Sequence, residues 1–196
     1  MHIKESSLKT LGYICEELES NILNEDNTNL VISALVEALE SSKDNEELMK
    51  IAVEAVLHSL VFAEKIFEEK KGDIIIERIL DNALNPSSDV RTTVMMCIAE
   101  IVRLYYDHVH NFMEKITEVT FQIMKEDAEE VGTMAVEVWC SFCEEEIFLK
   151  KRKKQGNDYV FKVFSPLLDI ILLLLNDSEL DEDEDSDSWN KSTAAG

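Results

Sequence analysis

Hydrophobic residues recur at helical spacing along nearly the whole of this 196-residue chain. Apolar side chains return at i, i+3, i+4 and i+7, and strict alternation of apolar and polar positions is absent. The chain has only 5 Gly and 2 Pro, too few for the many turns of an all-β fold. The pattern therefore predicts an all-α protein, either one domain or one stretch of a repeat array.

One helical pattern repeats along the chain with a period of about 40 residues. When Ile3, Met49, Val90 and Val131 are taken as position zero, the spacings are 46, 41 and 41 residues. Positions +4, +7, +8 and +11 then form one helix face, apolar in 14 of 16 cases: Ser7, Thr10, Leu11, Ile14, Val53, Val56, Leu57, Leu60, Val94, Cys97, Ile98, Ile101, Ala135, Val138, Trp139 and Phe142. A second set of helices is predicted between these, at 28–40, 73–84, 111–125 and 158–175.

Each unit is thus a helical hairpin with the period of HEAT or armadillo repeats. One hairpin cannot bury its apolar face alone, but stacked hairpins can, which predicts an α-solenoid of HEAT repeats, an armadillo-like superhelix. We expect a single array over 1–196, divided into a partial repeat (1–20), three repeats (28–65, 73–107 and 111–148) and a truncated repeat (157–196) with an acidic loop (177–188). Because residues 3–18 form a second helix with no first helix before it, we expect this chain to be part of a longer array.

The net charge of the chain indicates which classes of partner it can bind. Lys and Arg number 19 against 41 Asp and Glu, giving a net charge of −22. Such a field repels nucleic acid and anionic membranes and attracts basic polypeptides. The longest apolar run, around 170–175, is far too short to span a membrane, and no signal peptide precedes the first helix. We therefore expect neither nucleic acid nor membrane as a partner.

Two segments interrupt the repeat with runs of one charge. Residues 150–154 are all basic, and residues 177–187 hold eight carboxylates before Ser188-Trp189-Asn190. The acidic run is either an inert solubilising insert or a site for a Lys/Arg-rich partner, on which Trp189 can stack. Calcium binding is a weaker option, because the spacing of an EF-hand is missing. The basic run is either a plain loop or a partner in cis for the acidic run.

The cysteines, histidines and short motifs of the chain show no pattern typical of a catalytic site. Four cysteines lie in apolar helical text, typical of reduced, buried intracellular thiols, and the single CxxC at Cys140 and Cys143 has no second pair. The four histidines show no metal-ligand spacing, and the chain has neither a Gly-rich phosphate loop nor a nucleophile elbow. We predict a binding protein with no enzymatic activity, no metal and no cofactor.

Several stretches of the chain resemble the importin-β (karyopherin-β) family of nuclear import receptors. They are His2–Leu8, Leu11–Cys15, Leu104-Tyr105-Tyr106, Glu137-Val138-Trp139, Cys143–Glu146 and the acidic run closed by Trp189-Asn190. Their order and spacing are similar to those of the family from late in HEAT repeat four to early in repeat eight. The Trp-terminated acidic loop is the most specific of these features, since generic HEAT arrays lack it.

The resemblance implies a transport receptor that carries cargo or a cargo adaptor through nuclear pores by binding Phe-Gly nucleoporins, with release by Ran-GTP. Its partners would be a basic importin-β-binding segment of an adaptor such as importin-α, or basic cargo, and it would occur in the cytoplasm, the nucleus and the nuclear envelope. The family's main Phe-Gly site maps to Ile32, Ser33, Val36, Ile75 and Ile76. One helix face cannot bury all of the three adjacent isoleucines at 74–76. The chain departs from the family at Gly72, where Glu is frequent, and in lacking an aromatic near Ile75.

Adaptor and Ran contacts would lie on the surface made by the second helices. The resemblance assigns them to Glu137 and Glu144 and to the acidic loop: Asp181, Glu182, Asp183, Glu184, Asp185, Asp187 and Trp189. For Glu137 and Glu144 the alternative is an ordinary solvated helix face. The rival function is a HEAT scaffold subunit of another complex, such as a phosphatase or a chromosome-associated assembly, which has no reason to carry the acidic loop.

Overall fold

The protein is described by a computed structural model that covers residues 2–18, 22–69 and 71–177. These residues form α-helices joined by turns and short 3-10 segments, with no strand among them, which confirms the all-α prediction. The helices are α1 (His2–Glu17), α2 (Glu25–Ser41), α3 (Glu46–Ser59), α4 (Glu64–Glu68), α5 (Asp73–Leu80), α6 (Ser88–Tyr105), α7 (Met113–Glu126), α8 (Glu129–Lys151), α9 (Tyr159–Lys162) and α10 (Phe164–Asp177).

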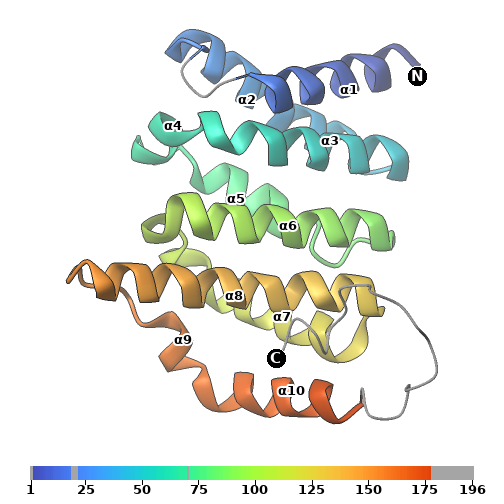
Figure 1. The fold of residues 1–196 in the computed structure, drawn as a ribbon. Coiled ribbons are helices and arrows are strands. Elements are labelled where there is room, and N and C mark those ends of the chain that lie inside the picture. Colours follow the sequence, from blue (N-terminus) through green and yellow to red (C-terminus); the bar gives the residue numbers. More distant parts are fainter. Residues whose placement is uncertain (1, 19–21, 70, 178–196) are drawn as a thin grey trace.

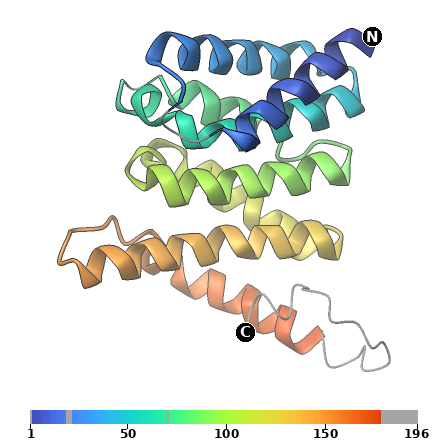
Figure 2. The ribbon, with the colours of Figure 1, turned by 45° about the horizontal axis from the view of Figure 1, so that its top comes forward.

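The helices are arranged in two layers (Figure 1). The second helices of the predicted hairpins, α1, α3, α6 and α8, stack side by side in one layer. The first helices lie in the other layer, where α2 contacts α5 and α7 contacts α10, and each hairpin pairs one helix of each layer: α2 with α3, α5 with α6 and α7 with α8. Figure 2 shows the same stack from another side, with successive hairpins following one another along one axis. This is the architecture of an α-solenoid.

The predicted helix register is buried in the middle of the stack and exposed at α1. Its members in α6, from Val90 to Ile101, are at most 2% exposed. In α8, Trp139 is 2% exposed and Phe142 is fully buried. In α1, by contrast, Ile3 and Ile14 are 83% and 46% exposed. The apolar face is therefore present in all four helices, but its burial depends on what packs against it.

Two of the first helices in the structure differ from the predicted ones. The helix expected at 73–84 is α-helical only to Leu80 and continues as a turn. The helix expected at 158–175 is divided at Val163 into α9 and α10. Pro166 explains the division, because a helix running through it would lose the hydrogen bond from residue 166 to the carbonyl of Lys162. Pro166 is tolerated in the first turn of α10, where its missing N–H is not needed.

Two consecutive tyrosines at the end of α6 bind to different neighbours. The hydroxyl of Tyr105 donates to the carbonyl of Leu60, and its ring stacks on Phe67 with centroids 3.8 Å apart. The hydroxyl of Tyr106 donates to Glu146 at 2.9 Å and accepts from the backbone N–H of Asn157 at 3.1 Å. The backbone of Tyr105 is no longer helical (φ −136°, ψ 38°). The side chains of Tyr105 and Tyr106 therefore point in different directions. One contacts the preceding hairpin and the other the following one.

The close packing of Phe67 explains why residue 72 is a glycine. A Cβ atom added at Gly72 would clash with three ring atoms of Phe67. Phe67 is 1% exposed and held by its stack on Tyr105, so its ring has no room to move away. The departure from the family at Gly72 is thus a packing requirement of the turn between α4 and α5.

Ion pairs join one repeat to the next near the start of the second helices. Lys50 Nζ of α3 lies 2.5 Å from Asp89 of α6, and this hydrogen bond raises the pKa of Lys50. Arg91 of α6 forms a bidentate pair with Asp127, at 2.6 Å for each of two nitrogens, and also donates to the carbonyl oxygens of Asn85 and Pro86. The Arg91–Asp127 pair is only 17% and 13% exposed, so it is well shielded from solvent.

Candidate partner-binding surfaces

The first candidate surface is the strip where α2 and α5 meet. Among the residues predicted to bind Phe-Gly repeats, Ile32, Ile75 and Ile76 are buried at 6%, 1% and 1% exposure. Ser33 is exposed and Val36 is half-buried. The three isoleucines at 74–76 are indeed not all buried, but the exposed one is Ile74, at 44%. The reason is the phase of α5, in which Ile75 and Ile79, and Ile76 and Leu80, point into the core as i, i+4 pairs.

Two ion pairs fix the relative direction of these first helices. Lys65 of α4, just before α5, pairs at 2.8 Å with Glu25 at the start of α2. Near the other end, Arg78 Nε of α5 lies 2.5 Å from Glu40 of α2. The two helices therefore run in the same direction.

One apolar side chain of each helix lies on the same side as the Arg78–Glu40 pair. Val36 precedes Glu40 by one turn and Ile74 precedes Arg78 by one turn. Val36 and Ile74 therefore lie on the same sides of their helices as Glu40 and Arg78, which pair across the junction. We call the strip formed by Ser33, Val36 and Ile74 the α2–α5 seam; exposed Leu30, one turn before Ser33, extends it along α2.

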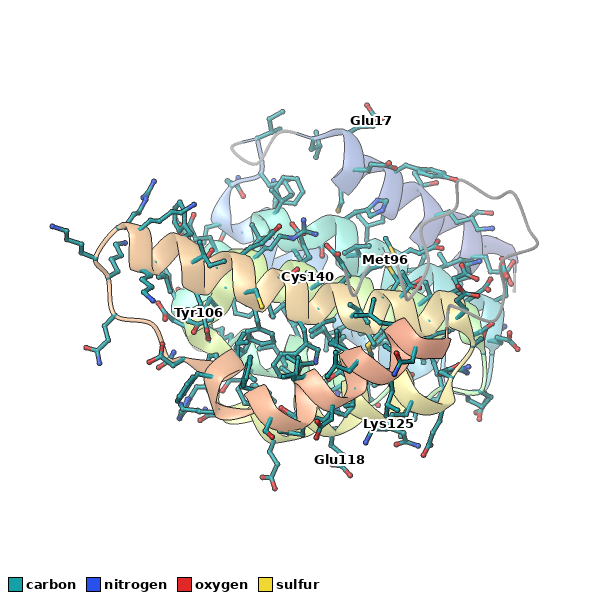
Figure 3. The ribbon with its side chains drawn as sticks, turned by 60° about the horizontal axis from the view of Figure 1, so that its bottom comes forward. Glu17, Met96, Tyr106, Glu118, Lys125 and Cys140 are labelled. Carbon is teal, nitrogen blue, oxygen red and sulfur yellow. The ribbon has the colours of Figure 1, made fainter. Side chains whose placement is uncertain are left out.

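The second candidate surface is the outward side of the second-helix layer. Figure 3 shows Met96 of α6 and Cys140 of α8 on this side, with Glu118 and Lys125 of α7 on the opposite side. Glu137 is half-buried and Glu144 exposed, and both lie on α8. A separation of seven residues puts them on one face, about 10 Å apart along the axis. The structure therefore keeps the two carboxylates together on one side of α8.

The neighbouring carboxylates of α8 have other environments. Burial raises the pKa of Glu145, and the negative charge of Asp107 raises it further. Glu146 accepts hydrogen bonds from the Tyr106 hydroxyl at 2.9 Å and from the backbone N–H groups of Tyr159 and Val160 at 2.5 and 3.4 Å. Glu146 therefore fixes the chain where α9 begins. Sequence patterns do not indicate this role, because the partners of Glu146 lie 13 to 40 residues away.

The basic run is partly helical rather than a plain loop. Lys150 and Lys151 belong to the last turn of α8, and Arg152 stacks on Phe148 with its guanidinium carbon 4.2 Å from the ring centroid. Lys153 has a positive φ of 56° and starts the turn away from the helix. The loop itself occupies the residues from there to Asp158.

The predicted acidic loop, with Asp181 to Asp187 and Trp189, lies outside the described residues. Across 2–18, 22–69 and 71–177, no group of three or more His, Cys, Asp or Glu side chains is arranged to hold a metal. Burial raises the pKa of Cys140 to about 11, which keeps it a thiol at neutral pH. In the same part of the chain, no helix combines the length and the hydropathy that crossing a membrane requires.

Comparison with known proteins agrees with this architecture. Importin subunit beta-1 of Arabidopsis thaliana is 29% identical over 205 residues, covering 100% of this chain and 24% of that protein. Importin subunit beta-1 of Schizosaccharomyces pombe is 30% identical, covering 98% of this chain and 24% of its own length. A crystal structure of importin beta superposes with a TM-score of 0.89 at 28% identity, covering 100% of this chain and 25% of that one. No protein-family model matches the chain.

The two-layered stack and these matches define an α-solenoid of HEAT repeats, as the sequence predicted. More particularly, the chain is homologous to importin subunit beta-1 along its whole length. It spans about a quarter of the length of these relatives.

Proposed function

We propose that this chain is part of a nuclear transport receptor of the importin-β type. The observation that carries the proposal is the match to importin subunit beta-1 over all, or nearly all, of the chain, in sequence and in fold. The receptor would carry cargo or a cargo adaptor through nuclear pores, moving between cytoplasm and nucleus. It would act by binding and not by catalysis, as a transport receptor does. The rival reading, a HEAT scaffold of another complex, is not favoured by these relatives.

The α2–α5 seam is the proposed site for Phe-Gly nucleoporins. Val36 and Ile74 offer apolar atoms at the surface, and the buried side chains of Ile32, Ile75 and Ile76 form the floor beneath them. A phenylalanine ring inserted between the two helices would be worth about 1.5–3 kcal/mol, which suits weak contacts multiplied along a repeat. Two solved structures of the same fold are a Kap95:Nup1 complex and a complex of Kap95p with RanGDP.

The second-helix surface is the proposed site for a basic adaptor segment and for Ran. Glu137 and Glu144 share one side of α8, and the excess of 41 acidic over 19 basic residues attracts basic chains. We propose the carboxylates of 177–187 and Trp189 for the same partners. Neutralising those eight carboxylates should lower the association rate of a Lys/Arg-rich adaptor peptide and flatten its salt dependence.

A charge placed in the seam tests the nucleoporin site. Ile74→Asp and Val36→Asp should weaken binding to immobilised Phe-Gly repeats about tenfold or more, because each puts a carboxylate beside the inserted ring. Leu104→Asp is the matched control, since Leu104 is 43% exposed on α6 against 44% for Ile74 on α5. Its binding should stay at the wild-type value. Equal binding by folded Ile74→Asp and Leu104→Asp variants would remove the Phe-Gly site from the seam.

A further inference from the structure

The last turns of α8 extend beyond the stacked part of its layer. Counted from Met49, Val90 and Val131, α3 ends 10 residues later, α6 ends 15 later and α8 ends 20 later, at Lys151. A second helix of the length of α3 or α6, stacked on α8 in the same register, would end level with Glu146 or before it. A neighbour of that length would leave the turns from Ile147 onward accessible, and in the structure Ile147 and Phe148 are 52% and 44% exposed.

These turns form one wall of an open pocket of about 650 Å³. The opposite wall is the loop after α8, together with α9 and the start of α10. Its apolar part includes Ile147, Phe161 and Phe164, which are 52%, 80% and 54% exposed, and half-buried Val160. Three large apolar side chains exposed together around one pocket mark a surface that binds an apolar group.

Lysines lie beside the apolar part of the pocket. Lys150 and Lys154 are among its lining residues, one in the last turn of α8 and one in the loop. Residues 150–162 hold six basic side chains and one acidic one, Asp158, whereas the whole chain has 19 basic and 41 acidic residues. This corner is therefore positive in a protein that is otherwise strongly negative.

Two carboxylates, Glu146 and Asp158, also line the pocket, so its lining holds as many acidic as basic side chains. Glu146 already accepts hydrogen bonds from the Tyr106 hydroxyl and from the N–H groups of Tyr159 and Val160. Asp158 is solvent-exposed and stands alone among the basic residues of this stretch. Because the rest of 150–162 adds four basic residues and no acidic one, a ligand with several negative charges would still meet a net positive corner beside the apolar part of the pocket.

We propose that this pocket binds an acidic peptide segment of a partner protein. An aromatic or branched aliphatic side chain of that segment enters between Ile147 and Phe161, and its carboxylates pair with Lys150 and Lys154. This surface is opposite in charge to the one proposed for basic adaptors. It would give the receptor a contact for acidic partners, separate from the seam and from Glu137 and Glu144.

Fluorescence anisotropy with the labelled peptide EEDFDELEE tests the proposal on the full 196-residue chain. Lys150→Glu with Lys154→Glu should lower the affinity roughly tenfold more than Lys151→Glu with Lys153→Glu, a control with the same change of charge in the same run. Phe161→Ser should lower it about ten- to hundredfold, whereas Phe148→Ser, which removes a ring that does not line the pocket, should leave it unchanged. A peptide of sequence EEDSDESEE or QQNFNQLQQ should bind at least about tenfold more weakly.

Three results would overturn the proposal. Equal loss in the two lysine double variants would reduce the site to a diffuse basic patch. Full affinity in Phe161→Ser and in Ile147→Ser would remove the apolar part. Binding that appears only after the carboxylates of 179–187 are neutralised would assign the pocket to the chain's own acidic stretch instead of a partner. Because Phe161 is 80% exposed, its replacement is not expected to unfold the chain, and circular dichroism of each variant checks this.

Discussion

α1 and α8 carry the same helical register but differ in what covers it. In α8, Trp139 and Phe142 lie inside a ring cluster with Phe121, Tyr106 and Tyr159. In α1, Ile3, Leu11 and Ile14 line an open pocket of about 610 Å³, although the face around Gly12 and Cys15 packs against α3. The register in the sequence thus determines which helix face is apolar. A neighbouring hairpin determines how much that face contributes to stability.

Hydrogen exchange should show this difference most strongly. Amides of residues 50–143 should exchange mainly through global opening, which costs about 5–15 kcal/mol in typical domains. Amides of α1 should exchange orders of magnitude faster, because α1 is packed on one face only. Peptide-level mass spectrometry at several times gives both rates. Protection of α1 equal to that of α6 would mean that another chain covers its open face.

A cavity in the middle of the stack should have the next largest effect. Phe142→Ala removes a fully buried ring and should lower the free energy of unfolding by about 3–5 kcal/mol. Ile14→Ala in α1 should lower it by less than about 0.5 kcal/mol, because Ile14 is half-exposed. Urea titration followed by circular dichroism measures both. Similar losses in the two variants would mean that the open face of α1 is buried in solution.

Gly72 and Gly12 should respond in opposite directions when each is replaced by alanine. Gly72→Ala forces a Cβ into the immobile Phe67 ring and should cost about 1–3 kcal/mol. Gly12→Ala meets Ala55 Cβ at 3.4 Å, and the helix propensity of alanine should stabilise α1 by up to about 1 kcal/mol. Thermal unfolding of both variants gives the comparison. A stabilised Gly72→Ala variant would refute the tight packing of the α4–α5 turn.

The smallest effect is expected from removing a single hydroxyl. Tyr106→Phe deletes the bond to Glu146 and leaves the backbone N–H of Asn157 without its acceptor, which should cost about 1 kcal/mol. Tyr13→Phe is the control, since Tyr13 is 64% exposed on α1 and should change stability very little. Tm values, which move about 2–4 °C per kcal/mol in a chain of this size, resolve the two.

Much of the fold can be predicted from the sequence, because stacked repeats need apolar residues at regular intervals along the chain. The spacing of Met49, Val90 and Val131 gave the three central second helices, and their predicted faces are buried. The break at Val163 was missed because the pattern of apolar residues continues through it. Pro166 was the local signal that marks it.

The candidate site depended on details that periodicity does not contain. Three successive isoleucines fit more than one helical phase, and Ile79 and Leu80 select the one that exposes Ile74. The pocket beside Lys150 and Lys154 depends on Phe161 and Phe164, which return to α8 only through the turn held by Glu146. The hydrogen bonds that hold that turn join residues far apart in the sequence. For this reason the sequence pattern predicted residues 150–154 as a loop and did not predict the pocket beside them.

The divergent pair Tyr105 and Tyr106 makes the end of α6 a mechanical linkage. Tyr105 contacts Leu60 and Phe67. Tyr106, the next residue, contacts Glu146 and Asn157. A tilt of one hairpin therefore pulls on the next through two adjacent α-carbons, with no flexible spacer between them. At this junction the hairpins on either side of α6 are thus tied to one point of the chain, and we expect a tilt of either one to move the other.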